Sequence, residues 1–231
     1  ITGSHGKTTT TSLVAKIFSD QKLDPTIING GVINSLKSNA KLGKGDWAIL
    51  EADESDGSFL KLQINYSIVT NIDYEHLDFY KNYKNLENSF IKFINKTPPT
   101  GKAIICIDST NVRKILNKIK NKNILTYGEN KAANYKIDNI RYNIDSTNFD
   151  LSFKNREKNN KKKIKNINVK LLGKHNVLNA AAAFIVCLNL GVDQNTIKES
   201  LKNFSGVQRR MTKVFSKNNN DFYDDYAHHP T

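Results

Sequence analysis

The sequence predicts an α/β fold, with a mostly parallel sheet flanked by helices and a small antiparallel β edge. Over residues 1–128, short apolar segments alternate with stretches of helical periodicity, which is typical of a parallel sheet covered by helices. From Tyr135 to Leu172 the pattern changes to alternating strands separated by turns rich in Asn, Asp and Lys. This change indicates antiparallel strands at one edge of the sheet.

A Gly-Lys-Thr loop connects the first expected strand to the first expected helix. The segment Gly3–Thr8, here called the phosphate loop, places Gly3 and Gly6 before Lys7 and Thr8. Free N–H groups at a helix start attract anions, Lys7 can reach terminal phosphates, and the Thr8 hydroxyl suits Mg²⁺. The common motif has four residues between its glycines and this loop has two, so a glycine-rich turn before an ordinary helix is the alternative. The loop predicts a nucleoside triphosphate site with a solvent-facing Lys7.

The remaining elements are expected from apolar runs, helical spacing and turn residues. The run at Trp47–Leu50 is continuous, as in a strand that is buried on both faces. In order, we expect a helix with Leu13, Val14, Ile17 and Phe18 on one face, a strand at Thr26–Ile28, a loop at Asn29–Gly31, strands at Trp47–Leu50 and Tyr66–Ile72, a helix carrying Leu86, Phe90, Ile91, Phe93 and Ile94, a strand at Ala103–Ile107, a helix at Asn111–Ile119, a strand at Asn123–Gly128, and helices at Val177–Leu190 and Asn195–Phe204.

Polar clusters follow two of these strands at the end where ligands bind in open parallel sheets. Residues 51–56 hold four carboxylates directly after one strand, and residues 73–78 follow another. Glu51, the first polar residue after its strand, is the best-placed Mg²⁺ ligand, and a solvated turn is the alternative. His76 could be a structural histidine, but its place at a strand end favours a role in the same site.

The composition sets limits on function. The 231 residues carry a net charge of +13, which would suit a nucleic-acid-binding module. Much of the excess lies in Arg156–Lys163, a charged run that is more typical of a solvated hairpin tip and lacks the aromatics needed for base stacking. Cys106 and Cys187 lie in apolar segments and predict buried free thiols. No apolar stretch reaches membrane-spanning length, so we expect a cytoplasmic protein without membrane insertion.

Six strings, in this order along the chain, resemble the Mur ligases, whose ATPase domain also occurs in folylpolyglutamate synthetase. They are Gly3–Thr11, Asp24–Thr26 with Asn29–Gly31, Glu51–Phe59, Thr70–Ile72 with Glu75–Asp78, Gly173–Ala183, and Asp224–Thr231. The resemblance implies a P-loop-like central ATP-binding domain at residues 1–206, and a linker with the start of a carboxy-terminal Rossmann-like domain at residues 207–231. Both ends of the chain look cut, so we expect a fragment of a longer protein.

The resemblance also implies an activity: the ATP-dependent joining of L-alanine to the lactyl carboxylate of UDP-N-acetylmuramate through an acyl phosphate, in peptidoglycan synthesis. A ligase that recycles murein tripeptide onto UDP-N-acetylmuramate, and a different P-loop phosphotransferase, are the alternatives. ATP and Mg²⁺ are the implied cofactors. The implied catalytic residues are Lys7, Glu51 and His76; the ATP-binding residues Gly3, Ser4, His5, Gly6, Lys7, Thr8, Thr9, His175, Asn176, Asn179, Arg210 and Asp225; the metal ligands Thr8, Glu51 and His76; and the substrate contacts Asn29, Ser55 and His228.

Overall fold

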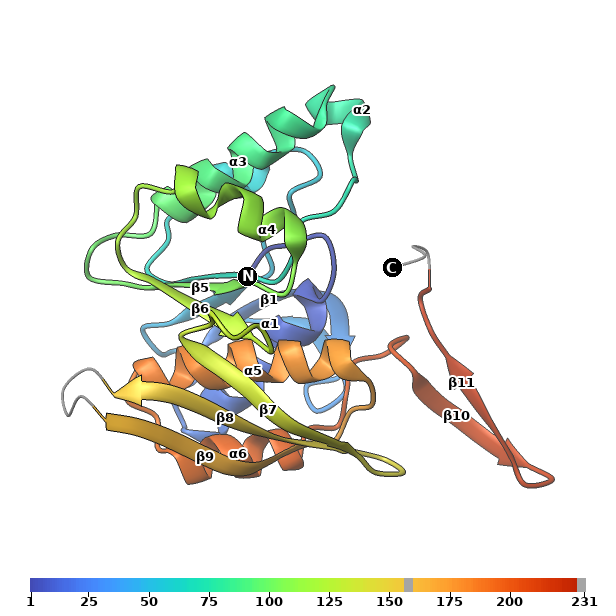
Figure 1. Cartoon of the computed structure of the whole chain (residues 1–231). Coiled ribbons are helices and arrows are strands. Elements are labelled where there is room, and N and C mark those ends of the chain that lie inside the picture. The colour runs from blue at the N-terminus through green and yellow to red at the C-terminus, as the bar shows by residue number, and fades with distance from the viewer. Residues whose placement is uncertain (156–159, 228–231) are drawn as a thin grey trace.

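The computed structural model describes residues 1–155 and 160–227, and its elements alternate as expected (Figure 1). The helices are α1 (Lys7–Asp20), α2 (Leu77–Tyr80), α3 (Tyr83–Asn95), α4 (Thr110–Ile115), α5 (Lys174–Asn189) and α6 (Gln194–Lys202), with short 3-10 turns at Ser58–Lys61 and Leu116–Lys118. The strands are β1 (Thr26–Ile33), β2 (Ser38–Lys41), β3 (Ala48–Leu50), β4 (Ser67–Val69), β5 (Ala103–Cys106), β6 (Ile124–Gly128), β7 (Tyr135–Tyr142), β8 (Thr147–Asn155), β9 (Asn160–Val169), β10 (Thr212–Lys217) and β11 (Asn220–Asp224).

The main sheet has the order β4-β5-β6-β7-β8-β9. Its strands are parallel from β4 to β7 and antiparallel from β7 to β9, which confirms the expected mostly parallel sheet with an antiparallel edge. A second sheet has the order β2-β1-β3, in which β1 runs parallel to β3. The α/β fold class predicted from the sequence is therefore correct.

The segment Ile1–Thr2 joins the two sheets. The backbone nitrogen of Ile1 donates to Leu50 O at the end of β3, at 2.8 Å. The amide of Thr2 donates to Ile68 O in β4 at 2.9 Å, and Thr2 pairs in parallel with Val69. The strand that feeds the phosphate loop therefore lies between the two sheets, as the central strand of a doubly wound fold does.

Helices cover both faces of the main sheet. On β5, Ile104 and Cys106 belong to the core beneath α1, α5 and α6, whereas Ala103 and Ile105 belong to the core beneath α3 and α4. Side chains alternate between the two faces of a strand, so a strand that is covered on both sides reads as a continuous apolar run. Both Cys106 and Cys187 are buried free thiols, as expected.

Two expectations for the smaller sheet are wrong. Asn29–Gly31 lie inside β1 rather than in a loop. A Cβ on Gly30 would stand only 2.8 Å from a Glu51 carboxylate oxygen, so this glycine allows a close approach and does not mark a turn. The run at Trp47–Leu50 is not buried on both faces. Ala48 is exposed, and only Ile49 is fully buried, because α1 covers one face of this sheet. The strand β2 was not expected at all.

The described lysines of the basic run and the carboxy-terminal hairpin are largely exposed. Residues 156–159 fall outside the described residues, and Lys161–Lys163 lie in β9 rather than at a hairpin tip. Lys163 Nζ pairs with Asp150 Oδ2 at 3.2 Å. The β10–β11 hairpin extends away from the body of the molecule, and its strands are almost entirely exposed (Figure 1).

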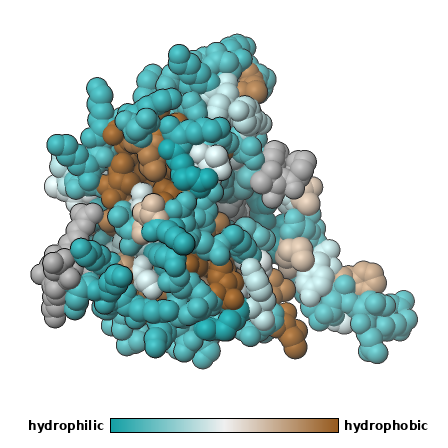
Figure 2. Space-filling model, viewed as in Figure 1, coloured by the Kyte–Doolittle hydropathy of each residue, from teal (hydrophilic) through white to brown (hydrophobic). Residues whose placement is uncertain are grey.

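The surface in this view is mostly hydrophilic, with separate apolar patches (Figure 2). Among the described residues, no helix has the length and apolar character that crossing a bilayer requires.

Candidate active site

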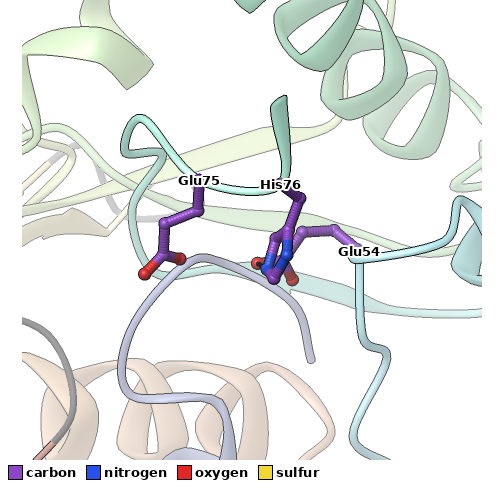
Figure 3. Close-up of side chains that lie close together, drawn as sticks. All are labelled: Glu54, Glu75 and His76. Carbon is purple, nitrogen blue, oxygen red and sulfur yellow. Dashed lines mark ion pairs between the residues drawn. The ribbon is translucent and has the colours of Figure 1, made fainter. Parts of the chain in front are cut away.

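Three loops meet at the carboxyl ends of neighbouring parallel strands. They are the phosphate loop, the carboxylate loop (residues 51–56) after β3, and the histidine loop (residues 70–76) after β4. Figure 3 shows Glu54 and His76 pointing toward each other, with Glu75 beside them. One ligand atom of each of these three residues lies within 4.8 Å of the others. The sequence therefore predicted correctly which loops share one end of the sheet.

Both glycines of the phosphate loop have a structural reason. Gly3 and Gly6 have φ angles of 134° and 84°, which residues other than glycine rarely adopt. A Cβ on Gly3 would stand 2.2 Å from Thr70 Oγ1, and a Cβ on Gly6 would stand 2.4 Å from Asn179 Oδ1. The loop therefore packs against the histidine loop on one side and against α5 on the other.

The histidine loop fixes the backbone of the phosphate loop. The amide of His5 donates to Asn71 Oδ1 at 2.7 Å, and Thr70 Oγ1 donates to His5 O at 2.6 Å. The amide of Asp73 donates to Ser4 Oγ at 2.8 Å. The His5 ring lies 3.3 Å from an Asp73 carboxylate oxygen. The sequence analysis gave Thr70 and Asn71 no role at the phosphate loop, although they lie in one of the strings that carry the family resemblance.

The start of α1 is suited to an anion. Its N-cap is Gly6, no side chain among the described residues caps it, and its first turn holds no acidic residue. Orphan N–H groups and the helix dipole then favour a negatively charged ligand such as a phosphate. Thr9, in this first turn, is almost fully buried.

The side-chain oxygens of Thr8 and Glu51 lie in contact. Thr8 Oγ1 donates to Glu51 Oε1 at 3.0 Å, and the amide of Gly30 donates to Glu51 Oε2 at 2.6 Å. Adjacent ligands of an octahedral Mg²⁺ are about 2.9 Å apart when each is about 2.05 Å from the ion. The Thr8–Glu51 separation and the hard oxygen donors therefore fit Mg²⁺.

Lys7 does not face solvent, contrary to the expectation. Its Nζ lies 3.1 and 3.0 Å from the two carboxylate oxygens of Glu54 and 3.6 Å from an oxygen of Asp53. The Lys7 side chain is 11% exposed, and that of Glu54 is 1% exposed. The physical reason is that a cation at this loop pairs with the nearest buried carboxylate.

Glu54 is the main residue that the sequence analysis missed. Burial raises the pKa of its carboxyl group, while the nearby Lys7 acts to lower it. Thr2 Oγ1 donates to Glu54 Oε2 at 3.5 Å, and the Tyr80 hydroxyl donates to Glu54 O at 2.5 Å. Its only sequence signal was membership in the carboxylate loop, which does not say which carboxylate turns inward.

His76 points into the site rather than into the core. It stands at the N-cap of α2 with a φ of 57°, but within the described part of the chain its side chain makes no capping hydrogen bond. Its Nε2 lies 3.8 Å from Glu54 Oε1. The two simple structural roles, a helix cap or a core histidine, therefore do not describe this side chain.

The residues expected to bind adenine lie at the start of α5. Asn179 is buried and donates through Nδ2 to Asn176 Oδ1 at 3.3 Å, beside Gly6. Burial lowers the pKa of His175, and the carboxylate of Asp225 acts to raise it. This places His175 near the end of the β10–β11 hairpin.

The other residues expected in the site contact neighbouring protein groups. The Arg210 guanidinium lies 5.8 Å from the centre of the Tyr226 ring, and Asp225 accepts a hydrogen bond from the amide of Met211 at 2.7 Å. Asn29 is buried and donates to Ser12 Oγ and Gly31 O, and the amide of Ser55 donates to Asp53 Oδ1. His228 lies outside the described residues.

Comparisons with known proteins found relatives of this chain. The model of the Mur ligase middle domain matches residues 1–187. The chain is 56% identical over its whole length to a UDP-N-acetylmuramate–L-alanine ligase of Pelagibacter ubique and 44% identical to one of Rhodopseudomonas palustris. It spans 50% and 49% of those two proteins. A solved UDP-N-acetylmuramate–alanine ligase of Thermotoga maritima superposes with a TM-score of 0.84 at 28% identity, covering 99% of this chain and 50% of that one.

Proposed function

This chain belongs to the Mur ligase family, and from that premise we propose that it is part of an ADP-forming ligase that joins L-alanine to the lactyl carboxylate of UDP-N-acetylmuramate. The proposal rests chiefly on one observation: the phosphate loop carries Lys7 and brings Thr8 into contact with Glu51, at a helix start that no side chain of the described residues caps. The choice of substrates is supported by the names of relatives that match the whole chain.

We propose that the phosphate loop, from Gly3 to Thr9, holds the phosphates of ATP. Asn179, flanked by His175 and Asn176, would hold the adenine, because it borders the loop at Gly6. Arg210 and Asp225, which lie just before and just after the β10–β11 hairpin, would close over the nucleotide. Asn29, Ser55 and His228 stay predicted substrate contacts.

Thr8, Glu51 and His76 would hold divalent metal. Bound Mg²⁺ would supply positive charge where the γ-phosphate meets the substrate carboxylate. Lys7 contributes a second positive charge at the phosphates, which stabilises the charge that develops during phosphoryl transfer. A carboxylate is a poor electrophile at neutral pH, so conversion to an acyl phosphate prepares it for attack by the amine of L-alanine.

We propose a domain boundary near residue 206. Residues 1–206 contain the two sheets and their covering helices, and residues 207–231 would start the following domain, because the hairpin makes little contact with the body. The chain by itself should fold but should not ligate, since it spans half the length of its relatives. Ligation by residues 1–231 alone would contradict this division. The cytoplasmic location stays a prediction.

The experiment uses the full-length enzyme that contains this chain. We expect ADP release that requires both UDP-N-acetylmuramate and L-alanine, with the amide product identified by mass spectrometry. Murein tripeptide is supplied in place of L-alanine in a parallel reaction. Faster turnover with the tripeptide would favour the recycling ligase instead, and phosphate left on a stable acceptor would favour a phosphotransferase.

A further inference from the structure

The ion pair between Lys7 and Glu54 bears directly on how nucleotide enters the site. Both Glu54 oxygens contact the Lys7 ammonium, at 3.1 and 3.0 Å, and the carboxylate is fully buried. An ammonium group has three donors, and the neighbouring Asp53 oxygen at 3.6 Å lies near the third. In this structure the Lys7 ammonium, which the proposed function assigns to the phosphates, is therefore directed at protein carboxylates.

The surroundings of Glu54 hold it in place. Its backbone oxygen accepts from the Tyr80 hydroxyl, and its side chain accepts from Thr2, which lies in the segment joining the two sheets. The Tyr80 hydrogen bond fixes the backbone at Glu54, and the side chain would lose its contacts with Thr2 and Lys7 if it swung into solvent. An incoming phosphate group therefore meets a negative charge that is held in place. Nucleotide phosphates and Glu54 must then compete for Lys7, or share it.

We propose that Glu54 is the resting partner of Lys7, and that it weakens the binding of metal-free nucleotide because phosphate has to replace it. This inference rests on the proposed function, since it takes Lys7 as the phosphate ligand. A divalent ion brings its own positive charge to the phosphates and lessens the need for Lys7. The pair therefore makes the loop discriminate against nucleotide that arrives without its metal.

The test measures the Kd of ADP by calorimetry on the full-length enzyme, in EDTA and again with Mg²⁺. Glu54→Gln keeps the shape of the side chain and removes its charge. We expect this variant to bind metal-free ADP about tenfold more tightly, because the phosphates no longer have to replace a negative charge at Lys7. A unit charge a few ångströms from the ammonium is worth at least that factor in a protein site. With Mg²⁺ the gain should be smaller, about threefold or less on the same electrostatic reasoning.

Asp56→Asn is the matched control, because Asp56 lies in the same loop and accepts from the amide of Ser58 without contacting Lys7. It should leave the Kd of ADP unchanged. Glu54→Asp retracts the charge by one methylene group and should give a smaller gain than Glu54→Gln, so it serves as the second variant if Glu54→Gln does not fold. The absence of a gain in the folded Glu54 variants, or an equal gain in Asp56→Asn, overturns the proposal.

A double-mutant cycle separates competition for Lys7 from plain repulsion of nucleotide. In a Lys7→Met background, Glu54→Gln should change the Kd of metal-free ADP by less than about twofold, because no cation remains to be released. A tenfold gain that persists in that background would overturn the role of Lys7. If the wild-type enzyme binds neither ATP nor ADP with Mg²⁺, the proposed function fails. If it binds them and Glu54→Gln gains nothing, this inference alone fails.

Discussion

Two carboxylates of one loop, Glu51 and Glu54, have opposite surroundings although they are three residues apart. Glu51 accepts from the Thr8 hydroxyl and the Gly30 amide, both neutral donors. Glu54 is fully buried and holds the Lys7 ammonium with both oxygens. Neutral donors orient Glu51 without neutralising it, so its negative charge stays available to a divalent ion. Glu54 already has its counter-ion within the protein.

The comparison shows that position in the loop matters more than residue type. Glu51 follows the strand directly, whereas the Glu54 side chain is buried and the Tyr80 hydroxyl holds its backbone oxygen. Substitutions on the Lys7–Glu54 side should therefore alter both stability and activity. Substitutions on the Thr8–Glu51 side should alter metal dependence with little effect on stability.

Lys7→Ala should have the largest effect. We expect ligation to fall about 100- to 1,000-fold, because the loss of one preorganised charge-stabilising group typically costs that much. The free energy of unfolding should fall by about 3 kcal/mol, since a buried carboxylate loses its partner. The double variant Lys7→Ala/Glu54→Gln should regain most of the thermal stability but none of the activity. Near-normal turnover in Lys7→Ala would refute the phosphate-loop assignment.

Glu51→Gln should be the next largest. We expect the Mg²⁺ concentration that gives half-maximal rate to rise at least about tenfold, because even lost supporting contacts of a metal site cost that much. The melting temperature should stay close to that of the wild type, because the substitution keeps the shape of the side chain and an oxygen that can accept from a neutral donor. A magnesium titration of the initial rate makes the measurement, with Asp56→Asn as the control. An unchanged titration curve would mean that Glu51 is not a metal ligand.

His76→Ala should lower kcat more than it weakens ATP binding. The side chain reaches the site through contact with Glu54, at 3.8 Å, rather than through the phosphate loop itself. We expect kcat to fall about 100-fold, in the range seen when a positioned histidine is lost, and the Kd of ATP to change by less than about threefold. Single-turnover kinetics and calorimetry separate the two quantities. A parallel loss of both would indicate a nucleotide-binding role.

Asp53→Asn should have the smallest effect and sharpens the comparison within the Lys7 side. Its side chain is 54% exposed, and its oxygen stands 3.6 Å from Lys7 Nζ. Exposed ion pairs contribute about 0.2–1 kcal/mol, so the free energy of unfolding should change by no more than that, and the Kd of ATP by less than about fivefold. Chemical denaturation and calorimetry measure the two quantities. A change as large as that of Glu54→Gln would show that burial is not what distinguishes these two carboxylates.

The sequence predicted the sheet, its antiparallel edge and the three loops of the site. Those predictions depend on the spacing of apolar residues and on where each strand ends, which are local properties of the sequence. The contacts of Glu54 could not be predicted, because its side chain meets Thr2 and its backbone oxygen meets Tyr80, and both residues are distant in sequence. The glycines of β1 were misread for a related reason, since Gly30 lies in a strand to admit a carboxylate from another loop.

The segment Ile1–Thr2 has a consequence for how the molecule opens. Its backbone hydrogen bonds to Leu50 and Ala52 on one side and to Ile68 and Thr70 on the other connect the two sheets, and the same backbone continues into the phosphate loop. Separating the two sheets would break these hydrogen bonds and disrupt the phosphate loop. The two sheets should therefore exchange their amide hydrogens as one cooperative unit. Nucleotide bound at the phosphate loop would then slow amide hydrogen exchange in strands of both sheets, including strands that it does not contact.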